Sequence, residues 1–232
     1  MKKPDENPFN ILYEDDRYII INKPCGIMVH RTKISEDTRF VLQLLRNQIK
    51  QHIFPVHRLD RATSGVLVFG KDREAAGFLS EQFRAQQVDK KYVAIIRGHV
   101  PDSDTIDYDL AKTPRHEPQQ AISHYTKISE SEMPFAISRY PTSRYSFVSV
   151  KIDTGRRQQI RRHFAHIRHP IIGDKRHGDC KHNNYFQAHF NLHRMLLHAA
   201  EFQFKHPGLE EPLLIKAEWN EEFERAKQFL KL

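Results

Sequence analysis

The stretch HRLDRATSGVLVFGK, residues 57–71, joins a polar segment to an apolar run and is the most informative part of the chain for its fold. Its second half contains Val66–Phe69, four apolar residues in a row, which is typical of a buried strand. Ile53–Val56 precedes it and has the same character, so the polar residues between the two runs are predicted to form a loop that joins two strands. Asp60 lies in this loop between two arginines. Loops that are fixed by rigid strands often display reacting groups, so Asp60 is the first candidate for chemistry.

The chemistry open to Asp60 follows from its neighbours. Arg58 and Arg61 favour the ionised form of its carboxyl group. An ionised carboxylate that is held in place can act as a nucleophile. The alternative is that Asp60 is a turn residue in a structural ion pair, and the spacing of the residues leaves both interpretations open.

The remaining elements are predicted from hydrophobic periodicity and capping residues. A helix is expected from Ser35 to Ile49, with Ser35 or Asp37 as its cap, and another after Asp72. Gly98–Pro118 is expected to be a polar, proline-containing excursion. Strands are predicted at Ile11–Tyr13, Tyr18–Ile21, Tyr92–Ile96 and Phe147–Ile152. Because strands and helices do not alternate regularly, an α+β fold is favoured over a doubly wound sheet.

Length and composition indicate a cytoplasmic protein with one domain, or one domain with appendages. The chain has 232 residues, which is long enough to bury a hydrophobic core. No apolar run approaches the roughly 20 residues that cross a bilayer, and the first residues lack the features of a secretory signal. Cys25 and Cys180 form no paired framework, so both are predicted to be free thiols.

The basic charge is concentrated in one segment. The formal net charge of the chain is +8. Nine Lys or Arg residues and only two acidic residues lie between Gly155 and Arg194, together with seven of the 15 histidines. Such a segment points to a polyanion, because each neutralised phosphate releases counterions. A solvated basic face with no ligand is the alternative.

A helix is predicted after Gly155 because apolar residues recur there with helical spacing. Ile160, Phe164 and Ile167 form the apolar stripe. Arg161 lies at the border of that stripe, where it would be partly buried and would need a carboxylate partner, for which Asp60 is a candidate. Arg157, Arg161 and Arg168 form the adjoining basic stripe, while Arg162, His166 and His169 are expected to point away.

Three patterns that suggest other chemistry are set aside. Gly65 to Lys71 fits GxxxxGK, but Asp72 stands where a phosphate-binding loop needs Ser or Thr. His163, His166 and His169 recur every three residues and drift around the helix, so solvated or RNA-contacting histidines are favoured over metal ligands, and no metal site is predicted. A packed thiol is favoured over a nucleophile for Cys25.

Several motifs, in the same order, resemble those of the RluA-type pseudouridine synthases. HRLDRATSG resembles the catalytic loop of that family, and Lys91-Tyr92 resembles its second motif. GRRQQIRRHFAHIRHPIIGDKRHG, from Gly155 onward, resembles the third motif, and MLLHA at 195–199 the C-terminal core. The resemblance covers roughly residues 11 to 215. It implies a mixed, mostly antiparallel central sheet flanked by helices and loops, a central active-site cleft, and an isomerisation of uridine that needs no cofactor. It also implies a single catalytic domain over residues 11–232 after an N-terminal extension at 1–10.

The resemblance also implies roles for individual residues. Asp60 would be the nucleophile, Tyr92 the aromatic partner and a candidate general base, and Arg161 the arginine that pairs with the aspartate. Leu197 would wall the pocket. Asp60 would either attack C1′ of the ribose or assist a glycal-type route, and the sequence leaves both open. The residues expected to contact RNA or substrate are His57, Arg58, Arg61, Thr63, Arg156, Arg157, Arg162 and Leu197.

The expected substrate is a folded RNA. The third motif and RYPTSRYSFV at 139–148 resemble most the C type of tRNA-modifying members, which act on uridine 65 of tRNA. Gln158 departs from the family pattern, which has histidine there. The chain is expected to have no small N-terminal RNA-binding domain of the kind that many relatives carry. RNA affinity is therefore expected mainly from residues 155–194, in a monomer without an obligate protein partner. The alternatives are a ribosomal RNA pseudouridine synthase, a ribonuclease and a non-catalytic RNA-binding module.

Overall fold

The computed structural model describes residues 8–31 and 37–232, which form two compact units. Unit 1 comprises the chain up to Asp89 together with Ala199–Glu218. Unit 2 comprises Lys90–His198 together with Trp219–Leu232. No helix in the described ranges has both the length and the apolar character that crossing a bilayer requires. The prediction of a single catalytic domain over residues 11–232 stays a prediction.

Unit 1 is built on an antiparallel sheet whose central strands are apolar on both faces. Every residue of β4 (Ser64–Gly70) is buried, and so are five of the six residues of β2 (Tyr18–Lys23). β2 and β4 pair from Tyr18 opposite Gly70 to Lys23 opposite Gly65. The strand order is β1 (Asn10–Glu14), β2 (Tyr18–Lys23), β4 (Ser64–Gly70) and β9 (Leu197–Phe204), with β3 (Phe54–Pro55) on β4 and β10 (Leu213–Lys216) on β9.

Helix α2 (Arg73–Arg84) packs against this sheet, and it begins where the sequence predicts. The Asp72 side chain accepts a hydrogen bond of 2.7 Å from Ala75 N, which satisfies an amide that the helix leaves unpaired. Ala75 and Leu79 are fully buried. They join the apolar cluster that contains Val66 and Val68 on β4. The helix therefore covers one face of the strand that follows Asp60.

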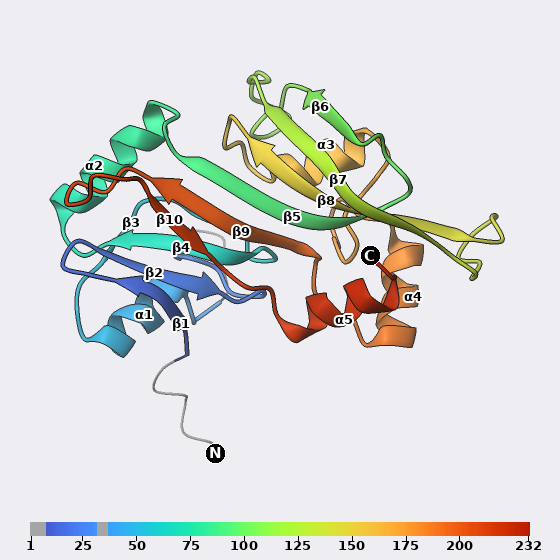
Figure 1. The fold of residues 1–232 in the computed structure, drawn as a ribbon, viewed down its shortest axis with the longest axis horizontal. Helices are drawn as coiled ribbons and strands as arrows, with labels where there is room; N and C mark the ends of the chain where they lie inside the picture. Colours follow the sequence, from blue (N-terminus) through green and yellow to red (C-terminus); the bar gives the residue numbers. More distant parts are fainter. Residues whose placement is uncertain (1–7, 32–36) are drawn as a thin grey trace, which may run out of the picture. The chain divides into compact units, whose positions relative to one another are not determined.

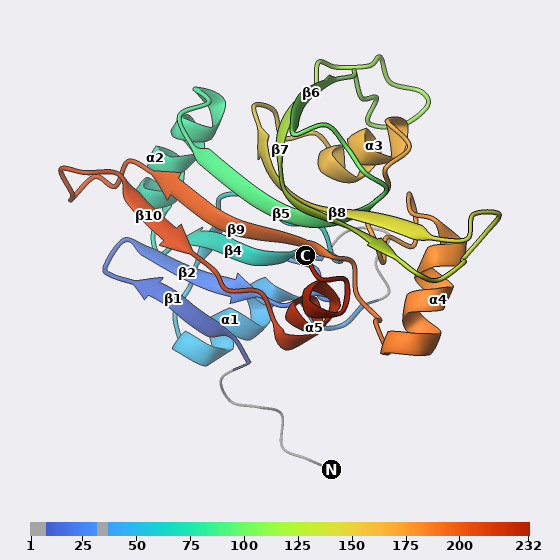
Figure 2. The same ribbon diagram turned by 45° about the vertical axis from the view of Figure 1, so that its right-hand side comes forward.

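Helix α1 (Val41–Ile49) starts six residues later than predicted. Its N-cap residue is Phe40, which is extended and makes no side-chain capping bond. Ser35 lies outside the described residues, and Asp37 lies before the helix and not at its cap. Val41 and Leu45 are the buried residues of the helix, so tertiary packing and not capping sets its start. Figures 1 and 2 show α1 beside β1 and β2.

Unit 2 contains a second antiparallel set of strands. The order is β5 (Asp89–Arg97), β8 (Ser143–Ile152), β7 (Ile122–Met133) and β6 (Ser103–Asp107). β6 lies inside Gly98–Pro118, the segment predicted as a polar, proline-containing excursion, and it was not predicted as a strand. Only Ile106 of β6 is buried, which explains why the sequence carried too little hydrophobic signal to predict it.

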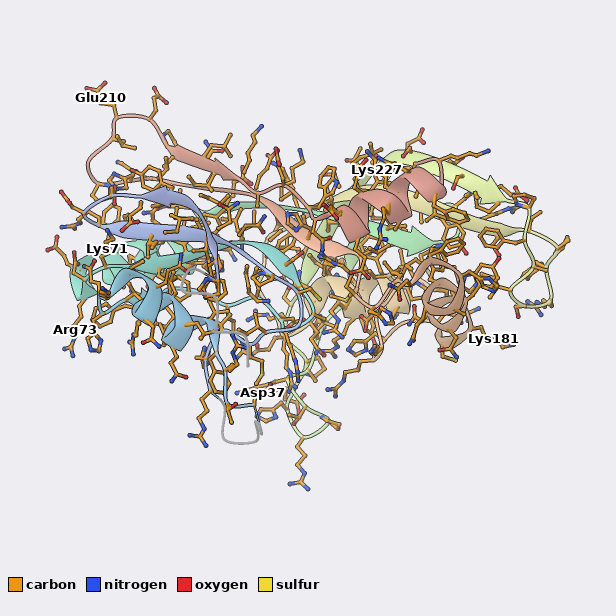
Figure 3. All side chains as sticks on the ribbon, turned by 90° about the horizontal axis from the view of Figure 1, so that it is seen from below. Asp37, Lys71, Arg73, Lys181, Glu210 and Lys227 are labelled. Carbon is orange, nitrogen blue, oxygen red and sulfur yellow. The ribbon has the colours of Figure 1, made fainter. Side chains whose placement is uncertain are left out.

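Three helices complete unit 2 (Figure 1). They are α3 (Gln159–His166), α4 (Cys180–Phe190) and α5 (Glu221–Phe229). The rings of Phe190 on α4 and Phe229 on α5 lie 3.8 Å apart between centroids. Lys227, labelled on α5 in Figure 3, places its ammonium group 5.3 Å from the centre of the Phe147 ring on β8. The unit is thus held by aromatic contacts, and the predicted α+β class is confirmed.

Candidate active site and RNA-binding residues

The predicted catalytic loop lies between β3 and β4 in unit 1. Asp60 is half-buried in it, with the buried Leu59 before it and Arg58 and Arg61 exposed. The backbone amide of Thr63 donates to Asp60 O at 3.1 Å, which closes a turn just before β4. The carboxylate therefore lies in the loop that leads into the apolar strand, as the sequence predicts.

Lys23 supports the loop from the end of β2. Its side chain is fully buried, and Nζ donates to Thr63 O and Pro24 O, each at 2.8 Å, and to Arg61 O at 3.4 Å. A buried ammonium group has a large desolvation cost unless it is hydrogen-bonded, and these carbonyl oxygens supply such bonds. Lys23 therefore fixes the backbone on the C-terminal side of Asp60. Sequence analysis missed this role, although a lysine that ends the apolar run at Tyr18–Ile21 was a usable signal.

The bend at Cys25 and Gly26 also holds the loop. Gly26 N donates to Arg61 O at 2.8 Å, and Arg61 Nε donates back to Gly26 O at 2.9 Å. The Cys25 thiol donates to Ala62 O at 3.1 Å, so it is a packed free thiol, as predicted. An Arg61 Nη1 atom lies 3.3 Å from the Asp37 carboxylate, which Figure 3 labels. Residues 23–26 thus contact the loop mainly through its backbone.

Gly65 marks a close approach of two backbones. Its φ is +116°, and a Cβ atom added there would lie 2.2 Å from Ala199 O on β9. Other residues rarely adopt this φ, and the missing side chain is what allows the approach. The glycine therefore sets where the catalytic loop ends and the strand begins.

His57 begins the loop and is held by aromatic contacts. Its ring stacks on Phe202 with centroids 5.0 Å apart and lies 5.3 Å from the Phe83 ring. Val68 N donates to His57 Nε2 at 3.1 Å, so this ring nitrogen carries no proton. His57 therefore fixes the loop within unit 1. The prediction that it also contacts RNA stays a prediction.

Arg58 is exposed and influences a neighbouring histidine. Two effects lower the pKa of His30. Burial of its ring is the larger, and the positive charge of Arg58 is the smaller. His30 is therefore neutral at pH 7, and it adds no positive charge next to the loop. The cationic groups of the loop itself are its two arginines.

In unit 2, Gln159 organises the start of α3. Its Oε1 accepts from Thr154 Oγ1 at 2.7 Å and from Arg156 N at 3.0 Å. Its Nε2 donates to Ile122 O at 2.8 Å and to Ser123 Oγ at 3.1 Å. One buried amide thus joins the helix start to β7. This role was not foreseen, because the sequence shows only one glutamine next to another.

Gln158, the departure from the family pattern, occupies the N-cap of α3 in a left-handed conformation with φ of 56°. Its Oε1 lies 2.9 Å from His177 Nε2. A glutamine oxygen accepts a hydrogen bond there as an unprotonated histidine nitrogen would. Gln158 thus makes, within unit 2, a hydrogen bond that a histidine at this position could also accept.

Arg161 is nearly buried, as its place at the border of the apolar stripe predicts, with 7% of its side chain exposed. Its Nε donates to Asp174 Oδ2 at 2.7 Å and its Nη2 to Asp174 Oδ1 at 2.8 Å. The expectation of a carboxylate partner is therefore met within unit 2 by Asp174, which sequence analysis overlooked. Whether Arg161 also pairs with Asp60, which belongs to unit 1, stays a prediction.

The other basic residues of this segment differ in exposure. Arg156 Nε donates to Gln120 O at 3.0 Å, and Arg162 Nη1 donates to Ala111 O at 2.9 Å. Both guanidinium groups therefore hold the loop between β6 and β7. Arg157 is exposed. Their predicted contacts with RNA stay predictions.

His163 is fully buried, which corrects the expectation that it is solvated or contacts RNA. Its Nδ1 lies 2.9 Å from Ser123 Oγ and its Nε2 3.0 Å from Tyr108 O, and burial lowers its pKa. His166 is exposed and stacks on the Tyr108 ring with centroids 3.6 Å apart. His169 is half-buried, and its Nδ1 lies 2.9 Å from Arg97 O. The three histidines thus have three different environments.

Two further predicted site residues lie on strands. Tyr92 is half-buried on β5 and pairs with Val150 on β8. Leu197 begins β9, and only 3% of it is exposed. The roles predicted for these two residues stay predictions.

The likeness to known proteins agrees with the motifs. Residues 17–166 match the family model described as RNA pseudouridylate synthase. A protein of Pectobacterium carotovorum named tRNA pseudouridine synthase C is 45% identical over 221 residues, which is 90% of this chain and 59% of that protein. One of the same name from Vibrio vulnificus is 43% identical over 230 residues, 93% of this chain and 94% of that protein.

Two solved human structures share the fold. RNA Pseudouridylate Synthase Domain Containing 4 is 24% identical, has a TM-score of 0.72, and the alignment covers 95% of this chain and 92% of that one. Domain Containing 1 has the same TM-score at 21% identity, with 94% and 86% covered. The predicted pseudouridine synthase fold is thereby confirmed. With the family model spanning well over half of the sequence, the chain belongs to the RNA pseudouridylate synthase family.

Proposed function

We propose that the chain isomerises a specific uridine of tRNA to pseudouridine, that the target is uridine 65, and that it acts without a cofactor. The observation that carries the proposal is the 43% identity over nearly the full length of a relative named tRNA pseudouridine synthase C. The ordered motifs around Asp60, Tyr92 and Arg161 add to it. A ribosomal RNA target in the same family is the second candidate.

Asp60 is the residue that acts on the ribose. The reaction breaks the bond from N1 to C1′, rotates the base, and joins C5 to C1′, while the proton leaves C5 and N1 gains one. The carboxylate either attacks C1′ or removes a ribose proton, and each route needs a fixed, ionised group. Lys23 and the Gly26 bend supply that fixity by holding the loop backbone next to Asp60.

Tyr92 and Arg161 complete the proposed catalytic set. Tyr92 offers a flat ring on which the extruded base can stack and a hydroxyl group that can move a proton. Arg161 offers a guanidinium group that pairs with the Asp60 carboxylate, and Leu197 contributes apolar surface to the pocket. The uridine has to leave its stack before it reacts, which costs a few kcal/mol.

Exposed arginines bind the phosphate groups on either side of the target uridine. Arg58, Arg61 and Arg157 are the exposed ones among the predicted contacts. Arg156 and Arg162, which are half-buried, also hold the loop between β6 and β7 within unit 2. His57 and Thr63 shape the catalytic loop, from which they approach the substrate. Binding through phosphates should weaken steeply as the salt concentration rises.

The test uses tRNA labelled with tritium at C5 of uridine, because isomerisation releases this label and leaves the strand intact. Wild-type protein should release tritium, and mapping should place the pseudouridine at position 65. Asp60→Asn should lose at least about 10⁴-fold in rate, since it removes the reacting group. Asp16→Asn, an exposed aspartate of unit 1, is the matched control and should keep the wild-type rate.

Each rival predicts a different outcome. A ribonuclease would shorten the tRNA, and a non-catalytic RNA-binding module would bind it and release no label. Release from ribosomal RNA but not from tRNA would favour the second candidate. Unchanged release by Asp60→Asn would refute the role of Asp60. We further propose that the enzyme acts in the cytoplasm as a monomer without an obligate protein partner, which a sedimentation measurement of the active species tests.

A further inference from the structure

The Asp174 carboxylate contacts the edge of the Arg161 guanidinium group that carries Nε and Nη2. The Nε and Nη2 atoms of the guanidinium group donate to two different oxygens of one carboxylate, at 2.7 and 2.8 Å. A single hydrogen bond would let the guanidinium group rotate about the bond axis. Two parallel bonds fix both its position and its plane. The direction of the remaining nitrogen, Nη1, is thereby set by Asp174.

The Asp174 carboxylate is itself fixed by the turn that follows it. Arg176 N and His177 N donate to its Oδ1 at 2.9 and 3.1 Å. Its carbonyl oxygen accepts from Gly178 N at 3.0 Å and from Asn183 Nδ2 at 2.9 Å. The backbone of residues 174–178 is thus folded around this one aspartate, so its orientation does not depend on Arg161 alone.

Two glycines show how tightly the chain is packed around the turn. A Cβ atom on Gly173, whose φ is +79°, would lie 2.0 Å from Arg194 O. A Cβ atom on Gly178 would lie 2.1 Å from Asp174 O. The carboxylate therefore has little freedom to move away from Arg161.

A gain in stability does not by itself explain the buried ion pair of Arg161 and Asp174. The exposed fractions of the Arg161 and Asp174 side chains are 7% and 1%, so both charges are removed from water. A buried ion pair is often no more stabilising than an apolar pair of similar volume, because desolvation offsets the attraction. What the ion pair provides, and an apolar pair does not, is a defined orientation of a guanidinium group.

We propose that Asp174 is a positioning residue of the reaction, which holds the plane of the Arg161 guanidinium group in its active orientation. The inference rests on the proposed function, in which Arg161 is a catalytic residue. Burial alone would raise the pKa of Asp174, but Arg161 and the two backbone amides together lower it, so the carboxylate is charged at neutral pH.

The test is a double-mutant cycle on the rate of tritium release from C5-labelled tRNA in a single turnover with enzyme in excess. Asp174→Asn, which keeps the shape and removes the charge, should slow release by about 10–100-fold, the size of effect that a small misplacement produces. The tRNA dissociation constant should change less than about twofold, because Asp174 is buried. Arg161→Met should slow release at least as much.

The decisive variant is Arg161→Met combined with Asp174→Asn. If Asp174 acts through Arg161, the double variant should match Arg161→Met within about twofold. If Asp174→Asn slows release by the same factor in both backgrounds, its role is in the fold and the inference is overturned. A wild-type rate in Asp174→Asn overturns it as well.

A spectroscopic measurement separates this inference from the proposed function. In protein labelled with ¹⁵N arginine, the Arg161 Nε–H should exchange slowly in the wild type and faster in Asp174→Asn. Asp179→Asn is the matched control, because Asp179 pairs with Arg97 in the same unit, and it should leave the Arg161 signal and the release rate unchanged. Slow exchange in Asp174→Asn would contradict the positioning role. A wild type that releases no label would refute the proposed function instead.

Should Asp174→Asn not fold, Arg161→Lys carries the test. Lysine keeps the charge and loses the planar fork. A release rate as low as that of Arg161→Met would support orientation as the requirement. A release rate close to the wild type would overturn it.

Discussion

The catalytic loop of unit 1 and the Arg161–Asp174 turn of unit 2 differ in the contact that matters most to each. In the loop, Lys23 and Gly26 bond to carbonyl oxygens, so its backbone is fixed. In the turn, a side chain is fixed by another side chain. Backbone bonds are insensitive to the identity of the residue that supplies the carbonyl, whereas the ion pair requires both of its members. The bond from Lys23 should therefore survive a change of the Thr63 side chain, whereas the ion pair does not survive replacement of Arg161 or Asp174.

The largest loss of stability is expected from Arg161→Ala. It leaves the Asp174 carboxylate buried without its partner, which typically costs about 3–5 kcal/mol of the free energy of unfolding. Urea denaturation at pH 7 measures it. Adding Asp174→Asn should recover part of the loss, because the unpaired charge is then gone. A variant as stable as the wild type would show that the pair is not buried in solution.

Gly65→Ala should have the next largest effect. A methyl group there needs both a strained φ and displacement of the Ala199 carbonyl, so about 2–4 kcal/mol of stability should be lost. Gly155→Ala is the control, since nothing lies within 4 Å of a Cβ atom at that position. Equal melting temperatures for the two variants would contradict the close approach of β4 and β9.

Lys23→Met tests the support of the loop and should cost about 1–3 kcal/mol, because Thr63 O and Pro24 O lose a buried donor. Lys216→Met, at an exposed pair with Glu201, should cost less than about 1 kcal/mol. Thermal unfolding compares the two variants. If the Lys23 variant melted like the Lys216 variant, the buried carbonyl contacts would contribute little.

The smallest expected effect is on the stability of the protein at acidic pH. Because the folded-state pKa of Asp174 is lowered, its contribution to stability is complete above the unfolded value near 3.8 and is lost as the pH falls through the folded value. The stability difference between the wild type and Asp174→Asn should therefore be constant from pH 7 to about 5 and shrink below pH 4. Urea titrations at pH 5, 4 and 3 measure it. A difference that grows on acidification would reverse the assigned direction.

Local patterns predicted much of the fold, and they failed where long-range packing decides. The cap at Asp72 was predicted and is confirmed, because it depends only on residues three apart. The start of α1 was placed too early, because Val41 and Leu45 determine it by packing and not by a cap. His163 was expected to be accessible, yet Ser123 and Tyr108, far away in sequence, enclose it.

The sequence by itself determined the family, the loop that carries Asp60, and the helix that carries Arg161, because these follow from contiguous motifs and periodicity. Only the tertiary structure revealed Lys23 beneath the loop and Asp174 beside Arg161. Lys23 and Thr63 lie 40 residues apart in the chain and Arg161 and Asp174 lie 13 apart, and each contact satisfies a buried charge. A sequence shows that a charge is present, but which partner satisfies it depends on how the chain folds back on itself.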